Sequence, residues 1–485
     1  MSTLTRPAPA ADHTPAAATA APHPPLLRGR YPGAHAVAMA RDPLGTIRAV
    51  ADFGRRQGAE AARIRAGGRT FVVVAHPDLA REVLVTQQRR FVRGYAHRGL
   101  RLLLGDGLLT SEGELHRRQR RLAQPAFHRE RIAAYGRAMT AAAERWDARW
   151  LARAGAGTGA ATTVDVFGEM TALTLGIAGE TLFGAEQTEG TAADVSAAMT
   201  DVLRAAPLIF FPLARHALHL PIPVARRYRA ARDRLDAIVY GIIAERRRAR
   251  AAGAPEGDDL LAMLLDATDP EDPAATPMTD GQLRDEVMTL FLAGHETTAA
   301  MLTWTWVLLA GAPDAAARLH AELDAVLGRG RGARAPTFDD LPRLPYTRMV
   351  LAEAMRLRPP AYAVGRICTE RTTVGGFTIE PDWGVITSPW LAHHDARWWP
   401  EPERFLPDRW AADDGSRPRL AYFPFGAGPR LCIGEQFAWT EATLVLATLA
   451  SRWEVGVVDA GAVGVRGAIT LRPSAAVPAV VRGRG

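Results

Sequence analysis

Apolar residues recur with a helical period through most of the chain. Such periods run over residues 117–122, 133–151, 170–182 and 228–250, and again over 313–327, 346–357 and 435–451. Residues that repeat every three or four positions place one apolar stripe against a core, so each run predicts an amphipathic helix. The pattern therefore indicates a mainly α protein.

The strongest helical pattern begins at Thr279. Thr279 and Gln282 have the spacing of a capping box, and apolar positions follow at Leu283 and Val287 and continue to Leu309. A helix of about 30 residues is ~45 Å long at ~1.5 Å per residue. We expect this helix to cross an entire domain.

Alternating residues predict strands in two regions. Residues 62–65 alternate, a turn with two glycines follows at 66–69, and an apolar run covers 70–74, which together predict a β-hairpin. Short strand-like segments follow Pro359-Pro360. We expect one large domain over residues 26–485, with small sheets near 60–75 and 361–390, after a disordered Ala/Pro-rich tail over 1–25.

Length and composition exclude several classes of protein. The longest apolar stretch, 299–312, is shorter than the ~18 residues that a membrane-spanning helix needs, so no membrane span is expected. Residues 1–25 lack the apolar core of a secretory signal peptide. Two cysteines, Cys368 and Cys432, are too few for a disulfide scaffold, a four-cysteine zinc site or a cysteine-ligated iron–sulfur cluster. These features predict a cytoplasmic protein.

The net charge of +7 raises the question of nucleic-acid binding. All 59 basic residues are arginines, and they form no long basic block and no basic patch interleaved with aromatic residues. A nucleic-acid partner is therefore not expected. The glycine-rich segment 328–333 follows a helix and does not join a strand to a helix, so we interpret it as a surface turn and not as a phosphate loop.

Cys432 lies in an unusual local sequence. A lone cysteine is more often a small buried apolar residue than a ligand. Here Gly426 and Gly428 allow a tight backbone fold, Arg430 adds a cation, and a helix begins after Gly434. A helix N-terminus and a nearby cation both favour the ionised thiolate. Glycine at 434 also leaves room for a flat macrocycle to approach.

This segment resembles the haem loop of the cytochrome P450 superfamily of haem-thiolate monooxygenases, and the resemblance extends from about residue 26 to the end of the chain. The fixed positions of the loop are all present: Phe425, Gly426, Gly428, Arg430, Cys432 and Gly434. The resemblance implies the P450 fold and haem b, with Cys432 as the iron ligand. It also implies that Phe425 packs against the ligand loop, that Arg430 pairs with a haem propionate, and that Ala438 lies against the porphyrin.

A second matching element is Glu353-Ala-Met-Arg356. By itself it could be a surface ion pair of a few tenths of a kcal/mol. Together with Pro402-Glu-Arg404-Phe it resembles the family's Glu-x-x-Arg and its distant arginine. The resemblance implies that Glu353, Arg356 and Arg404 form a buried network that supports the haem loop and takes no part in the chemistry.

The long helix contains a third element, Ala293-Gly294-His-Glu296-Thr297. Threonines inside helices usually bond to a carbonyl of their own helix, and a glutamate there is usually solvated. Gly294 weakens the helix by roughly 1 kcal/mol relative to alanine, so we expect a local break. The segment resembles the family's oxygen-binding groove, which implies that Glu296 and Thr297 deliver protons to dioxygen.

A fourth element comprises His116 and Arg120, which are four residues apart and share one helical face. The run of arginines around them could equally be a solvated helix surface. The resemblance implies that both residues bind a haem propionate, although many relatives have tryptophan where His116 stands, and that Arg366 is a further propionate partner.

The function implied by the resemblance is a monooxygenase that inserts one oxygen atom of O₂ into a hydrophobic molecule, such as a terpenoid or a fatty acyl compound. The segments 207–213 and 220–223 are poor in charge and are expected to roof the substrate pocket, although core packing or a membrane-touching surface would explain them as well. A peroxide-driven oxygenase and a non-catalytic haem sensor remain alternatives.

The electrons are expected from NAD(P)H through a separate ferredoxin and ferredoxin reductase, because the oxygenase pattern fills the chain. Arg117, Arg118 and Arg121 lie on other faces of the helix that carries His116 and are expected to help dock this partner.

Overall fold

The structure is a computed structural model that describes residues 21–155, 161–184, 195, 197–198, 201–202, 218–253, 259–268, 277–411 and 415–485. Of the tail expected over 1–25, residues 1–20 lie outside the described residues, as does the expected pocket roof over 207–213. Residues 22–25 run beside two strands, because the carbonyls of Pro22 and Pro25 accept hydrogen bonds from the N–H groups of Thr378 and Arg63, each at 2.8 Å.

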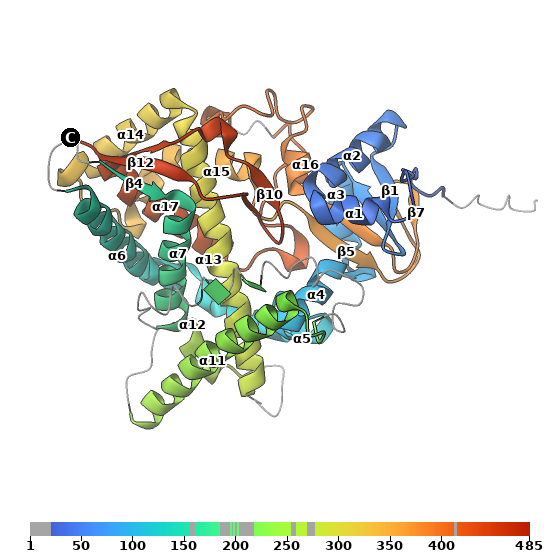
Figure 1. Ribbon diagram of the computed structural model, residues 1–485, viewed down its shortest axis with the longest axis horizontal. Coiled ribbons are helices and arrows are strands. Elements are labelled where there is room, and N and C mark those ends of the chain that lie inside the picture. The colour runs from blue at the N-terminus through green and yellow to red at the C-terminus, as the bar shows by residue number, and fades with distance from the viewer. Residues whose placement is uncertain are drawn as a thin grey trace, which may run out of the picture.

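One helix, α13 (Asp280–Ala310), runs through the helical part of the molecule (Figure 1). Its 31 residues correspond to the long helix predicted from the sequence, and the capping box is present. The N–H of Gln282 donates to Thr279 Oγ1 at 3.2 Å, and the N–H of Thr279 donates to Gln282 Oε1 at 2.9 Å. Most of its side chains are buried, so it forms the centre of the core.

The other predicted helices are confirmed, and most are longer than the sequence pattern by up to about a turn at either end. They are α5 (Gly113–Ala123), α6 (Arg129–Ala154), α7 (Val166–Phe183), α11 (Pro223–Ala251), α14 (Pro313–Leu327), α15 (Pro345–Leu357) and α17 (Glu435–Arg452). Shorter helices, which the pattern did not delimit, are α1 (Ala34–Arg41), α2 (Pro43–Arg56), α3 (Pro77–Arg81), α4 (Tyr95–Leu104), α12 (Leu260–Asp266) and α16 (Pro389–His393). None of the described helices is long and apolar enough to cross a membrane.

Strands from both regions predicted to form sheets are joined in one sheet. The hairpin of β1 (Ala61–Ala66) and β2 (Arg69–Val74) is confirmed, with Arg65 opposite Thr70. β2 pairs in parallel with β8 (Gly384–Thr387), and the sheet continues through β5 (Val364–Cys368) to β3 (Phe91–Arg93). In Figure 1 this β-rich part, with α1, α2 and α3, lies at the opposite end of the molecule from α6 and α14.

Three smaller sheets complete the described fold. β4 (Ala161–Asp165), β12 (Pro478–Gly483) and β9 (Trp453–Val457) form one of them. β6 (Thr372–Val374) pairs with β7 (Phe377–Ile379), and β10 (Val465–Gly467) pairs with β11 (Leu471–Pro473). The sequence pattern missed β3, β4 and the four strands after residue 452. Three of these, β3, β10 and β11, have only three residues each, and strands so short carry almost no periodic signal.

Candidate active site

The loop before α17 exposes one thiol. Gly426 and Gly428 have φ values of 76° and 73°, which an L side chain rarely adopts, and a Cβ on Gly428 would lie 2.1 Å from the carbonyl oxygen of Leu84. The glycines therefore allow the loop to fold back, and the N–H of Cys432 donates to the carbonyl of Phe425 at 3.0 Å. Cys432 is exposed, whereas Cys368 is buried.

The surroundings of Cys432 act on its thiol in opposite directions. Cys432 is exposed, but the protein atoms around its sulfur still disfavour the charged form. This burial effect is the larger one and raises the pKa of Cys432 to about 11. A hydrogen bond from the backbone of Gly434, just before α17, acts in the opposite direction and favours the thiolate. The Phe425 ring packs edge-on against Trp439 with 5.2 Å between ring centroids. Gly434 has ordinary space around it, because a Cβ there would meet no atom closer than 3.8 Å.

One short segment of α13 is accessible to solvent. Ala293 is exposed and Gly294 and Thr297 are half-buried, while the neighbouring positions are buried. The expected break in the helix is not present, because α13 is continuous from Asp280 to Ala310. The hydroxyl of Thr297 donates to the carbonyl of Ala293 at 2.7 Å, and that of Thr298 donates to Gly294 at 3.2 Å, so the local bonds are side chain to backbone.

Glu296, one turn after Ala293 on α13, is buried. It is 7 % exposed, and its Oε1 accepts a hydrogen bond of 2.7 Å from the hydroxyl of Thr470, which directly precedes β11. The sequence placed Glu296 beside Thr297 but gave no sign of Thr470.

A cluster of cationic and imidazole side chains lies beside the cysteine loop. The structure brings together the sequence-predicted residues His116, Arg120, Arg366 and Arg430 and adds Arg93 and His97. Burial and then Arg430 lower the pKa of His116 to about 3 and that of Arg366 to about 10. Burial, and then Arg93, Arg366 and Arg430, hold the pKa of His97 well below its usual range.

This cluster has little negative charge to balance it. Glu112 forms an ion pair with Arg430 and accepts from the N–H of Arg93. Arg93 Nε and His97 Nδ1 are buried without a hydrogen-bond partner in the structure. Buried cations are normally paired, so the arrangement favours an anionic group.

The residues present fit haem b. A macrocycle with two propionates would supply the missing anions, and Arg120, which also interacts electrostatically with Cys432, links the cluster to the exposed thiol. Cys432 and the neighbouring Leu431 are exposed, and exposed Ala293 interrupts a buried stretch of α13, so both places leave apolar surface for a flat ring. Ala438 lies half-buried in the first turn of α17, on the helix that follows the cysteine.

The network behind the loop differs from the sequence expectation in one member. Arg356 donates from Nε and Nη2 to Glu353 at 2.9 and 2.8 Å, and both side chains are fully buried. The side chain of Arg404 is 64 % exposed and pairs with Glu401, and only its carbonyl contacts Arg356, at 3.0 Å. Arg409 has the role that was expected of Arg404, because Arg409 Nε donates to Glu353 Oε1 at 2.9 Å.

The sequence contained a signal for Arg409. The pattern Pro-x-Arg-aromatic occurs twice, at 402–405 and at 407–410, and the second copy supplies both Arg409 and Trp410, whose Nε1 donates to Glu353 at 2.9 Å. His393, also missed, connects the network to the cysteine loop. Its Nδ1–H donates to the carbonyl of Arg356 at 3.2 Å, and its Nε2 accepts from the N–H of Phe423 at 3.0 Å.

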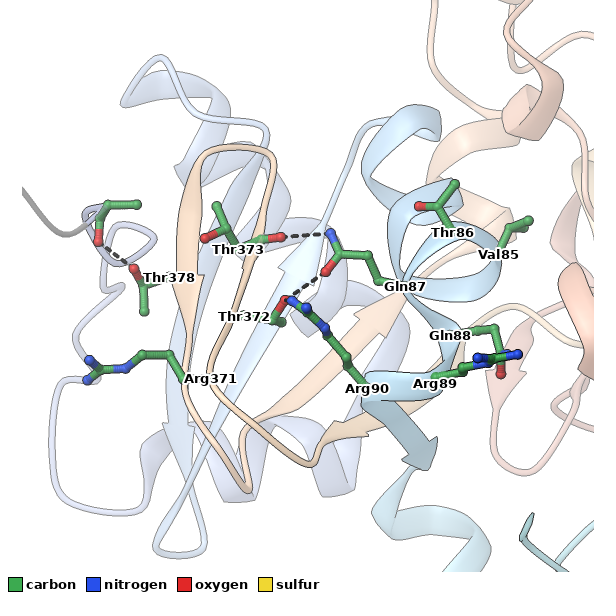
Figure 2. Close-up of a pocket in the computed structure, with 11 residues that line it drawn as sticks. Val85, Thr86, Gln87, Gln88, Arg89, Arg90, Arg371, Thr372, Thr373 and Thr378 are labelled. Atoms are coloured by element: carbon green, nitrogen blue, oxygen red, sulfur yellow. Dashed lines mark hydrogen bonds between the residues drawn. The ribbon is translucent and has the colours of Figure 1, made fainter. Parts of the chain in front are cut away.

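A surface cleft lies between the segment 85–90 and the β6–β7 hairpin (Figure 2). Two of its arginines already have partners: Arg371 binds both oxygens of Glu380, and Arg90 contacts Glu370 and donates to Thr372 at 2.7 Å. None of the residues predicted from the sequence for the active site lines this cleft. It is therefore separate from the site around Cys432.

Comparisons with known proteins agree with this site. The family model described as Cytochrome P450 matches residues 54–464. Cyclooctatin synthase and cyclooctat-9-en-7-ol 5-monooxygenase of Streptomyces melanosporofaciens are 38% and 37% identical, covering 87% and 91% of this chain and 87% and 92% of their own lengths. Pentalenene oxygenase of Streptomyces avermitilis is 35% identical, covering 89% of this chain and 92% of its own length.

Comparison with a solved structure also indicates a cytochrome P450. The crystal structure of the cytochrome P450DA heme domain superposes with a TM-score of 0.83 at 27% identity and covers 96% of this chain and 99% of its own. The chain belongs to the cytochrome P450 family and is a haem-dependent monooxygenase, an oxidoreductase that acts on a hydrophobic substrate.

Proposed function

We propose that this monooxygenase inserts one oxygen atom of O₂ into a terpenoid. The observation that carries the proposal is the similarity, over most of the chain, to pentalenene oxygenase and cyclooctat-9-en-7-ol 5-monooxygenase. The substrates in these names are an olefin and an olefinic alcohol. Exposed Ala293 on the otherwise buried α13 offers apolar surface of the kind that such a molecule needs.

The proposed roles follow from where each residue lies. Cys432 would bind the haem iron as a thiolate, and the bound haem supplies the activation of O₂. The propionates would be held by the side chains of the cationic cluster, namely Arg93, His97, His116, Arg120, Arg366 and Arg430. The ring would lie among Phe425, Gly426, Gly434, Ala438, Ala293 and Gly294.

Thr297 and Glu296 are proposed to handle protons. The Thr297 hydroxyl is half-buried at the open segment of α13, where it can pass on a proton and take another while its oxygen stays beside the Ala293 carbonyl. The Glu296 carboxylate can take up a proton at its oxygens and return it. Unchanged product formed per NADPH consumed in Thr297→Ala would remove Thr297 from the mechanism. Product formed with hydrogen peroxide in place of NADPH and the redox partners would favour a peroxide-driven oxygenase, which would not need this pair.

We also propose that electrons come from NAD(P)H through a ferredoxin and its reductase. Exposed Arg117 lies on α5, the helix that carries His116 and Arg120, and is paired with Glu114 one turn earlier. Arg118 and Arg121 are half-buried on the same helix. A positive helix beside the haem site would attract an acidic partner and raise its encounter rate.

The experiment that tests the substrate class is a binding titration of the haem-loaded protein. Olefinic terpenes, terpene alcohols, fatty acids and small polar aromatics are added while the haem absorption is recorded, and NADPH-dependent product is then measured with a ferredoxin and its reductase. Terpenes and their alcohols are expected to shift the spectrum and to be oxidised. A response to polar aromatics or fatty acids alone contradicts the terpenoid proposal, and binding without any product would favour a haem sensor.

A further inference from the structure

Aromatic rings lie in contact behind the cysteine loop. The centroid of the Tyr422 ring is 4.5 Å from that of Trp410, and the centroid of Trp410 is 5.4 Å from that of Trp399. Tyr422 is three residues before Phe425, whose carbonyl accepts a hydrogen bond from the N–H of Cys432 at 3.0 Å. Tyrosine and tryptophan are the aromatic side chains that lose an electron most easily, and electrons pass readily between rings in contact. These rings therefore offer an electron route that starts beside Cys432.

The tyrosine of this route has a fixed position. His393 stacks on Tyr422 with 4.9 Å between ring centroids, and His393 Nε2 accepts from the N–H of Phe423 at 3.0 Å. The Tyr422 hydroxyl donates to the carbonyl of Ala352 at 3.1 Å. A carbonyl is a much weaker base than a carboxylate, so it does not take the proton of an oxidised phenol. Tyr422 can therefore pass an electron on, but its oxidised state is not stabilised.

Trp410 differs from Tyr422 because a carboxylate lies beside its indole N–H. Trp410 Nε1 donates to Glu353 Oε2 at 2.9 Å, and Glu353 forms a buried ion pair with Arg356. An indole that has lost an electron is a strong acid, and a carboxylate at hydrogen-bond distance can take its proton. By contrast, Trp399 Nε1 donates to a backbone carbonyl, that of Ala392, at 3.1 Å. The geometry therefore favours oxidation of Trp410 over oxidation of Trp399.

Nearby cations act in the same direction. The guanidinium of Arg417 lies 4.5 Å from the ring centroid of Trp399, and that of Arg356 lies 5.4 Å from it. A cation over a ring is attracted by the ring electrons, so removal of an electron from that ring becomes harder. Arg417 is 5.6 Å from the centroid of Trp410, where the charge of Glu353 offsets it. An electron vacancy should therefore rest on Trp410.

Trp410 is also the ring of this pair that solvent can reach. Trp399 is 1 % exposed, whereas Trp410 is half-buried and its neighbour Ala411 is exposed. A small reductant in solution can therefore approach the Trp410 ring. Thiols suit this role, because two thiols that each lose one electron and one proton form a disulfide.

We propose that the haem-loaded protein has a second activity, a thiol peroxidase reaction in which Trp410 relays electrons from thiols in solution to the haem site through Tyr422. Hydrogen peroxide is reduced at the haem by two electrons, which pass through Trp410 one at a time. When an electron leaves Trp410, its Nε1 proton moves to Glu353, and it returns when a thiol replaces the electron. One hydrogen peroxide and two thiols give two waters and one disulfide. The inference rests on haem bound at Cys432, as proposed above.

The test adds hydrogen peroxide to the haem-loaded protein without an organic substrate. Electron paramagnetic resonance of rapidly frozen samples should show a tryptophan radical in the wild type, and Trp410→Phe should lose it. Glutathione should remove the radical and be oxidised to its disulfide, and this oxidation should fall in Trp410→Phe. Tyr422→Phe, which keeps the ring and removes the oxidisable phenol, should form the radical more slowly.

A measurement on the wild type alone keeps the test valid if Trp410→Phe folds poorly. Mass spectrometry after peroxide treatment without thiol should find an oxidised indole at Trp410, and not at Trp399. Glutathione added before the peroxide should prevent this oxidation. The absorption of the haem and of its reduced carbon monoxide complex shows that each variant is loaded.

Two other tryptophans are matched controls. Trp146 of α6 is half-buried and donates to a carboxylate, Glu169, at 2.7 Å, but among the described residues no ring contact joins it to the cysteine loop. Trp439 contacts Phe425 with 5.2 Å between ring centroids, but the guanidinium of Arg348 lies 3.2 Å from its centroid. Trp146→Phe and Trp439→Phe should both keep the radical.

The failures can be told apart. If the wild type forms no tryptophan radical, or if Trp410→Phe keeps the radical and the thiol oxidation, the relay is overturned and the haem site stands. A radical lost in Trp439→Phe and kept in Trp410→Phe also overturns the relay through Trp410. If the reduced carbon monoxide complex lacks the band of thiolate ligation, the haem site proposed at Cys432 fails, and the relay fails with it.

Discussion

At the residue scale, the two cysteines have opposite environments. Cys368 is 1 % exposed on β5, and its sulfur is 2.9 Å from the carbonyl oxygen of Glu370. Burial raises the pKa of the Cys368 thiol, and its sulfur is enclosed by the core. Cys432 is exposed at the start of α17, beside the arginines that would bind the propionates. The two thiols therefore differ mainly in their exposure, because the pKa of each is raised.

The first prediction follows from this contrast. In Cys432→Ser the reduced carbon monoxide complex should lose the absorption band typical of thiolate ligation, because serine offers no thiolate. Cys368→Ser should keep the band. Absorption spectra of both variants check this, and a band lost in Cys368→Ser and kept in Cys432→Ser would reverse the assignment.

At the element scale, the loop between α16 and α17 is held by Glu353 of α15. Its two oxygens accept from Arg356, Arg409 and Trp410 and from the N–H of Leu406 at 3.0 Å. The carbonyls of His393 and Pro402 accept from Arg356 at 2.8 and 2.7 Å. One buried ion pair therefore connects segments that precede the cysteine loop.

The second prediction separates the two candidate arginines. Arg409→Gln leaves Glu353 with less compensation of its buried charge and should lower the free energy of unfolding by about 3 kcal/mol. Arg404→Gln removes an exposed ion pair with Glu401 and should cost less than about 1 kcal/mol. Urea denaturation of the two variants measures the difference. Equal losses, or the larger loss in Arg404→Gln, would contradict the assignment.

The third prediction concerns α5. Reversing Arg117 and Arg118 to glutamate should slow reduction by a ferredoxin at low salt and leave substrate affinity unchanged, because attraction between exposed charges mainly affects encounter. The effect should shrink as salt rises, with a screening length of ~8 Å at physiological ionic strength. Stopped-flow reduction at several salt concentrations provides the measurement. A rate independent of both charge and salt would place the docking surface elsewhere.

At the scale of the whole molecule, two buried acids affect stability. Burial raises the pKa of Glu286 on α13 and of Glu441 on α17 to about 8. Glu286 Oε1 is buried without a hydrogen-bond partner, and both oxygens of Glu441 are buried, with Thr298 close enough to lower the pKa of Glu441. Both side chains should therefore be protonated in the folded protein at neutral pH.

The fourth prediction gives the sign of the pH dependence. Between the ordinary carboxyl pKa of 4.5 and the raised pKa of about 8, the folded state holds protons that the unfolded state releases, so the free energy of unfolding should fall as pH rises. Glu441→Gln is neutral at every pH and should flatten this slope. Denaturation midpoints at about pH 5, about pH 6.5 and about pH 8 measure the slope. An unchanged slope in Glu441→Gln would show that Glu441 is ionised in the folded protein.

Some features of the protein are determined by residues close together in the sequence. The helices follow from apolar periodicity, the start of α13 from Thr279 and Gln282, and the cysteine loop from Gly426 and Gly428, whose backbone angles need glycine. Each feature depends on interactions within a few residues, so the sequence by itself was enough to predict it.

The tertiary structure decided what distant segments contribute. It joins β1–β2 to β8, β5 and β3 in one sheet, replaces Arg404 with Arg409 on Glu353, and adds Arg93 and His97 to the cationic cluster. It also brings Thr470 to Glu296 across a separation of 174 residues. Such contacts depend on how helices and strands pack against one another, and the local pattern around a threonine or an arginine is the same whether or not a distant carboxylate lies beside it.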